Sequence, residues 1–149
     1  MVTGVAIDTV LVPIDGSDET RPAVEYAIAV AGRYDAGLHA MYVLGEEASQ
    51  AIEEGTVDDE EMAEEVQSVF SDIRGMAESE GIPFAHSITV GFSTTRKLVH
   101  PGSAVLDAAD QIDADFLVIP RESGLEEDDV LEKAAEYVLL YASQPVLSV

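Results

Sequence analysis

The stretch Thr9–Asp18, TVLVPIDGSD, places a short apolar run directly before residues that form turns. The run at 10–12 (VLV) is mostly β-branched, which is typical of a strand buried on both faces. Pro13 has no N–H, so we expect the strand ladder to weaken there. The DGSD that follows supplies turn and helix-capping side chains. The stretch therefore predicts a strand-to-helix corner, with the Asp15 carboxylate at the carboxyl end of the strand.

Beyond this corner, helical and strand-like patterns of apolar residues alternate along the chain. Pro22 fits the first turn of the first helix, which favours Thr20 over Ser17 as its cap. Gly91–Gly102 is expected to be a long connection. The predicted helices cover 21–34, 62–77, 104–112 and 130–142, and the predicted strands cover 10–12, 38–44, 84–90, 115–119 and 146–149.

This alternation predicts the fold class. Strands that alternate with helices imply right-handed crossovers and a parallel α/β sheet covered on both faces. The 149 residues fit a single domain, 1–149, and no repeat or linker suggests a second one. In such an open sheet, ligands bind outside the carboxyl ends of the strands, where the strand order reverses.

The charge balance is strongly acidic. Asp and Glu number 30 against 7 Lys and Arg, which gives a formal net charge of -23. One interpretation is a solvated surface suited to a salt-adapted organism, because the Debye length falls to about 3 Å at 1 M salt. The other is a cationic partner, or a cation site in Glu46–Glu65, which holds ten acidic residues. Nucleic acid is not an expected partner, since phosphate binding needs clustered Lys and Arg.

Several classes of protein are not expected. The chain has no cysteine, so disulfides and thiolate metal sites are excluded. No apolar run is long enough to cross a membrane, and MVTGVAIDTV lacks the basic region of a signal peptide, so we expect a cytoplasmic protein. His39, His86 and His100 lack metal-ligand spacing, and no serine lies in a nucleophile elbow. We therefore expect no metal and no catalytic constellation.

Three segments, in this order, resemble the universal stress protein (UspA-like) family: VLVPIDGSD at 10–18, HPGSAVLDAADQIDADFLVIP at 100–120 and EKAAEYVLLYASQPVLSV at 132–149. The resemblance covers nearly the whole chain. It implies an open five-stranded parallel sheet of order 3-2-1-4-5 with four helices on both faces, a Rossmann-like fold of the adenine nucleotide alpha hydrolase-like kind. It also implies a homodimer, often formed through the last strand, here Val146–Val149.

Many members of this family bind ATP, and the resemblance implies which residues would hold its adenine and ribose. Those positions are Pro13, Ile14 and Asp15 after the first strand, with Val43 from the second. Asp15 has a second interpretation, in which its carboxylate satisfies N–H groups of the turn before Gly16. Both interpretations stay open at this point.

The phosphate half of the family motif is altered here. ATP-binding members follow the fourth strand with G-x-x-G, about nine residues, and G-S/T. In this chain Pro120 replaces the first glycine, Ser123 lies near the second, and Glu132–Lys133 stand at G-S/T, with the acidic run 126–129 between. Lost donors cost about 1.5–3 kcal/mol each, and salt can screen the charge repulsion but cannot restore those donors. We therefore predict that the ordinary ATP mode is absent.

The remaining cations leave an alternative. Arg96, Lys97 and His100 lie in one connection, and Arg121 follows the fourth strand. Arg96 and Arg121 could hold a phosphate in a non-family way, or these cations pair with surface carboxylates.

Three functional hypotheses follow. The first is a non-enzymatic, dimeric stress-response module without cofactor that can also bind other proteins. The second is a stress protein that binds AMP or ATP through a non-standard phosphate site, with weak hydrolysis. The third is an enzyme related to the wider fold class, which rests on fold alone.

Overall fold

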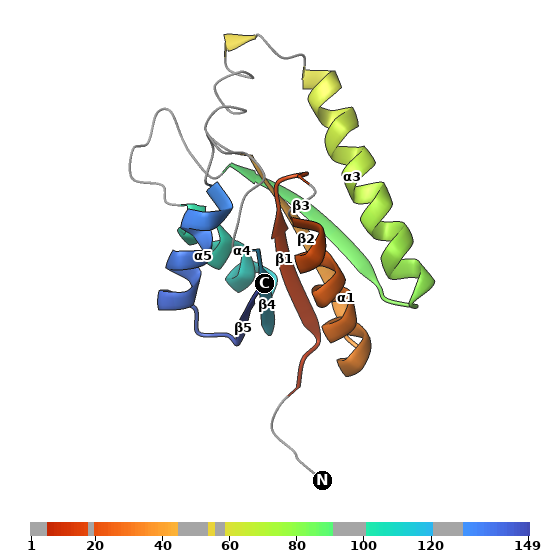
Figure 1. Cartoon of the computed structure of the whole chain (residues 1–149), viewed down its shortest axis with the longest axis vertical. Coiled ribbons are helices and arrows are strands. Elements are labelled where there is room, and N and C mark those ends of the chain that lie inside the picture. The colour runs from red at the N-terminus through yellow and green to blue at the C-terminus, as the bar shows by residue number, and fades with distance from the viewer. Residues whose placement is uncertain (1–5, 18–19, 45–53, 56–58, 91–100, 121–129) are drawn as a thin grey trace.

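A computed structural model describes residues 6–17, 20–44, 54–55, 59–90, 101–120 and 130–149. Its strands form one parallel sheet of order β3-β2-β1-β4-β5, which confirms the predicted fold class and strand order (Figure 1). The strands are β1 (Thr9–Ile14), β2 (Gly37–Leu44), β3 (Phe84–Val90), β4 (Phe116–Ile119) and β5 (Val146–Ser148), and the helices are α1 (Arg21–Tyr34), α3 (Asp59–Ser79), α4 (Pro101–Gln111) and α5 (Val130–Tyr141).

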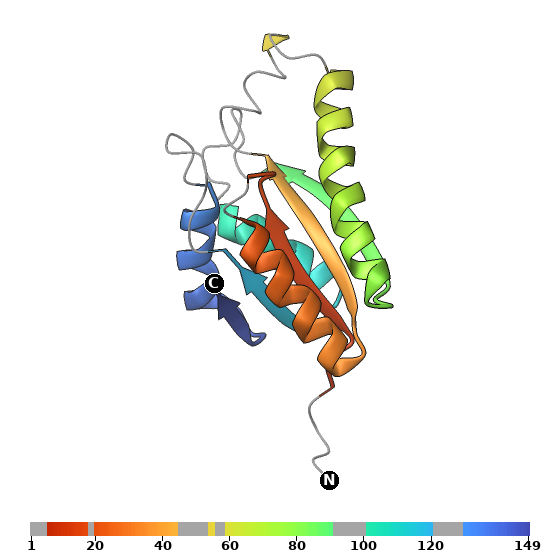
Figure 2. The same cartoon turned by 45° about the vertical axis from the view of Figure 1, so that its right-hand side comes forward.

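Helices cover both faces of this sheet. Figure 2 shows α1 and α3 in front of the strands and α4 behind them. Residues of α1 and α3, including Val24 and Phe70, pack with Val10 and Val12 of β1. Residues of α4 and α5, including Val138, pack with Leu11 on the other side. The run at 10–12 is completely buried, as expected for a strand covered on both faces.

The two neighbours of β1 pair with it over different lengths. The ladder with β2 begins where Thr9 lies opposite Gly37 and ends where Ile14 lies opposite Tyr42. The ladder with β4 contains only Val10–Phe116 and Leu11–Leu117, so it stops before Pro13. Pairing therefore weakens on the β4 side at the carboxyl end, which is the switch point of the strand order.

Helix α4 begins earlier than predicted. Pro101 and Gly102 belong to its first turn rather than to the preceding connection, because proline fits the start of a helix without losing a hydrogen bond. A Cβ atom on Gly102 would lie 2.3 Å from the Cβ atom of Tyr137 in α5. The glycine thus permits the close approach of α4 to α5.

Asp115 stands just before β4 and ties this strand to the start of β1. Its Oδ2 accepts hydrogen bonds from the backbone N–H groups of Asp8 (2.8 Å) and Thr9 (3.2 Å). Its own N–H donates to the carbonyl oxygen of Thr9 at 2.9 Å. The amino ends of the two central strands are therefore held together where their ladder is short.

Candidate functional site

The corner after β1 is closed by its own carboxylate. Asp15 is buried, and its Oδ1 accepts hydrogen bonds from the backbone N–H of Ser17 at 2.9 Å and from the Ser17 hydroxyl. Gly16 adopts a φ of +83°, a conformation that favours glycine. Asp15 thus performs the turn-stabilising role that the sequence allows for it.

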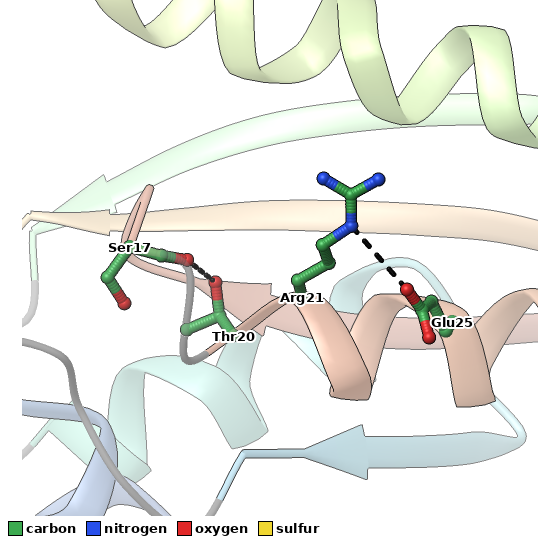
Figure 3. Close-up of polar contacts among 4 residues, drawn as sticks. All are labelled: Ser17, Thr20, Arg21 and Glu25. Atoms are coloured by element: carbon green, nitrogen blue, oxygen red, sulfur yellow. Dashed lines mark hydrogen bonds and ion pairs between the residues drawn. The ribbon is translucent and has the colours of Figure 1, made fainter.

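Thr20 occupies the N-cap position of α1, but its side chain does not cap the helix. Its hydroxyl donates instead to the carbonyl oxygen of Ser17 at 2.8 Å (Figure 3). A cap side chain normally accepts a hydrogen bond from the second or third residue of the helix, and the second residue here is Pro22, which has no N–H. The choice of Thr20 over Ser17 as the N-cap residue is therefore confirmed, but its side chain forms no capping hydrogen bond.

Tyr42 of β2 lies beneath this turn, a contact that the sequence did not reveal. A Cβ atom on Gly16 would lie 2.6 Å from the Tyr42 hydroxyl oxygen. Burial, together with the negative charges of Glu65 and Asp15, raises the pKa of Tyr42 above its usual value. Its ring also meets Phe70 of α3 edge-on, with the ring centroids 6.2 Å apart. The turn needs glycine both for its backbone conformation and for the space above this ring.

The four residues expected to hold adenine and ribose are divided between the faces of the sheet. Ile14 lies in the apolar cluster beneath α1 and α3, whereas Val43 lies in the cluster beneath α4 and α5. Because side chains alternate along a strand, Pro13 shares the face of Val43. Pro13 and Val43 therefore lie on one face of the sheet at its carboxyl edge, and Ile14 lies on the other.

Only part of the region that corresponds to the family's phosphate-binding motif lies within the described residues. Pro120 follows β4 directly and is buried, so the first position after this strand has no N–H to offer. Arg96, Arg121 and the other cations of the Gly91–Gly102 connection lie outside the described residues, as does the acidic run 126–129.

A cavity of about 110 Å³ lies beside the corner, between α1 and α3. It is lined by Ile14, Gly16 and Ser17 but not by Pro13, Asp15 or Val43. Arg21, at its rim, pairs with Glu25 one turn further along α1 (Nε to Oε1, 3.5 Å), and both side chains are exposed (Figure 3). Of the four residues that the resemblance assigns to adenine and ribose, this cavity thus contacts Ile14 alone.

Two of the three histidines lie on opposite faces of the β2–β3 pair. His39 Nε2 lies 2.8 Å from the hydroxyl oxygen of Ser87, while the ring of His86 stacks on Phe70 with the centroids 4.4 Å apart. Burial, and then the charge of His86, lowers the pKa of His39, which favours the neutral form of its imidazole. In the part of the chain that the structure describes, no group of three metal-ligating side chains occurs.

The sheet order and the turn at its switch point define a doubly wound, Rossmann-like α/β protein. The model of the Universal stress protein family matches residues 6–149, so the chain belongs to that family. None of the described helices is long and apolar enough to span a membrane.

Known relatives agree with this assignment. The chain is 29% identical over 145 residues to universal stress protein MJ0531 of Methanocaldococcus jannaschii, covering 94% of this chain and 80% of that protein. A universal stress protein solved in complex with cAMP shares the fold with a TM-score of 0.66 and 21% identity, covering 97% of this chain and 98% of that one. The universal stress protein of Archaeoglobus fulgidus in complex with dAMP has a TM-score of 0.62 at 21% identity, covering 95% and 96%.

Proposed function

We propose that this protein is a homodimeric, non-enzymatic stress-response module of a salt-rich cytoplasm, and that it does not hold ATP in the ordinary triphosphate mode. The observation that carries the proposal is Pro120, which is buried directly after β4, where the family motif has its first glycine. The Glu132–Lys133 pair, at the position of the motif's last glycine and hydroxyl, falls in the first turn of α5. Backbone amides at these positions would otherwise cradle phosphates.

A binding titration tests the loss of the triphosphate mode. The full chain is titrated with Mg-ATP at molar salt, where repulsion between the acidic surface and phosphate is screened. We expect no saturable binding in the micromolar range, because screening does not replace missing donors. Micromolar affinity, or ATP carried through purification and seen by its absorbance, would refute the proposal.

The dimer is proposed to form through β5. This strand lies at the end of the sheet next to β4 and is only three residues long. Leu139 of the preceding helix, α5, is exposed. Pairing with a second copy would cover the unpaired backbone groups of that edge. Sedimentation of the full chain and of a chain lacking 147–149 tests this, with Tyr34→Lys on α1 as a control. An unchanged monomer–dimer equilibrium after truncation counts against the β5 interface.

Salt adaptation has its own test. A folded chain of net charge -23 repels itself, and salt screens that repulsion. The free energy of unfolding should therefore rise steadily when potassium chloride is raised from 0.1 M to 2 M. A midpoint of urea unfolding that does not move with salt would contradict the salt-adapted surface.

A second candidate function is the binding of AMP or a cyclic nucleotide at Pro13, Asp15 and Val43. It is supported by the presence of these three residues at the ends of β1 and β2 and by relatives solved with cAMP and dAMP. Titration with AMP and cAMP tests it, using Asp15→Asn, which keeps an oxygen acceptor for Ser17. The matched control is Asp110→Asn on the exposed side of α4. Binding that is equal in both variants would exclude Asp15 from the site.

A further inference from the structure

Strand β3 forms the other end of the sheet, and its outer edge has no partner strand among the described residues. Its inner edge pairs with β2 over its full length. The pairing begins with Phe84 opposite Leu38, ends with Val90 opposite Leu44, and skips no residue on either strand. Figure 2 shows β3 as the outermost strand, with α3 running along it. Alternate residues of this strand thus present N–H and C=O groups along a regular outer edge.

Within the described residues of β3, several features that usually protect an edge strand are absent. Natural edges are protected by charged side chains, proline, a bulge or short length. The sequence of β3, FAHSITV, contains no charged residue and no proline, although 25% of the chain is charged. The ladder with β2 contains no bulge, and β3 is longer than the three-residue β5. The edge is therefore suited to pairing with another strand.

Both faces beside this edge offer room for side chains of an added strand. On the face of α3, Ile88 keeps 51% of its surface exposed. On the opposite face, Ala85 is exposed beside a hollow of about 260 Å³ that His39, Phe84 and Ile112 also line. Successive side chains of an added strand would alternate between these two faces. One set would cover Ile88, and the other would reach the hollow.

Charge decides which strand fits. Helix α3, which packs along β3, carries seven acidic residues and a single basic one, Arg74, which lies over the Phe84 ring at 5.5 Å. A second copy of the chain would bring its own acidic α3 against this edge, so pairing of β3 with itself is opposed by local repulsion. We propose that the outer edge of β3 binds an extended basic segment of a partner protein, which adds to the sheet as a sixth strand.

The experiment uses the full chain and a defined probe, a ten-residue peptide of alternating valine and lysine. A second peptide of the same sequence carries N-methyl groups on alternate residues, which removes the hydrogen bonds of one edge and keeps the charge. We expect the first peptide to slow hydrogen exchange at outward-facing amides of β3 and to bind at least tenfold more tightly than the second. Equal affinities would reduce the interaction to attraction between opposite charges and would overturn the proposal.

A pair of matched variants locates the contact. Ile88→Lys places a charge on the edge and should weaken binding of the first peptide at least tenfold. Tyr34→Lys makes the same change of charge at an equally exposed apolar side chain at the end of α1 and should leave binding unchanged. If instead Ile88→Lys breaks a dimer of the chain in sedimentation and the peptide never protects β3, the edge belongs to a second copy and the proposal is wrong.

Discussion

The two strands at the switch point, β1 and β4, end in opposite ways. After β1, the chain turns on Gly16, and the turn is closed by hydrogen bonds from Ser17 to the buried Asp15 carboxylate. After β4, the chain continues through a buried proline, Pro120, which can neither donate a hydrogen bond nor adopt a positive φ. The chain thus leaves β1 through a glycine turn closed by hydrogen bonds, and it leaves β4 through a residue that allows neither.

The difference teaches that two parts of one ligand site can be maintained for different reasons. The Asp15 turn is supported by contacts within the chain, because its carboxylate accepts a hydrogen bond from Ser17 and Gly16 leaves space for Tyr42. A glycine cradle for phosphates serves only the ligand, so nothing in the fold opposes its replacement by proline or bulky acids. The presence of the turn is therefore weak support for nucleotide binding, and our proposal against a triphosphate rests instead on Pro120 and Glu132–Lys133, which stand where the resemblance places glycines.

The largest effect should come from Gly16→Ala. The new methyl group meets a φ of +83° and the Tyr42 hydroxyl oxygen at 2.6 Å, and together these should cost about 2–4 kcal/mol of unfolding free energy. Urea unfolding measures the loss. Gly81→Ala is the control, because Gly81 has a φ of +71° but nothing within 4 Å of the added Cβ, and it should cost less. Equal costs would mean that Tyr42 does not limit the space at the turn.

The next effect should come from Asp15→Ala, which removes the acceptor of two part-buried hydrogen bonds from Ser17. Losing these hydrogen bonds should cost about 1–2 kcal/mol in urea unfolding, because each is worth about 0.5–1.5 kcal/mol and water can reach the half-buried donors. Asp15→Asn keeps one side-chain oxygen and should lose less than half as much. If Asn and Ala are equally destabilising, the carboxylate contributes through its charge and not through closing the turn.

Local patterns predicted most of the fold. The limits of β3 and the end of α1 agree with the sequence, because apolar periodicity, glycine and proline act over a few residues. The strand order came from the resemblance to the family and not from these patterns. The alternation of side chains along a strand is also enough, by itself, to put Ile14 and Pro13 on opposite faces of the sheet.

Contacts between distant segments were not predictable from the sequence. Tyr42 meets Gly16 only because the register of β1 and β2 places Ile14 beside Tyr42. Asp115 binds the N–H group of Asp8 across 107 residues, and no local signal marks it. Such contacts depend on strand register and on side-chain direction, which a single sequence does not specify.

A substitution of Pro120, directly after β4, should change stability only slightly. Pro120→Gly restores one N–H and raises the conformational entropy of the unfolded chain, so it should lower stability by about 0.4–1 kcal/mol. It should not create micromolar affinity for Mg-ATP, because the glycine-hydroxyl pair at the start of α5 stays absent. The measurements are urea unfolding and a titration at molar salt. ATP binding in this single variant would show that one donor after β4, and not the whole cradle, decides whether the chain binds ATP.

The smallest effect concerns the tyrosine beneath the turn. Because its folded pKa is raised above the usual value of 10, the unfolded chain loses the Tyr42 proton first as pH rises. Stability should be unaffected by this group below pH 10 and should fall as pH rises from there through the folded pKa. Tyr42→Phe should remove this part of the fall, measured as the urea midpoint between pH 8 and 11. Tyr26→Phe is the control, because it removes a hydroxyl from an exposed side chain. Identical pH profiles for wild type and Tyr42→Phe would place the Tyr42 hydroxyl in water instead of beneath Gly16.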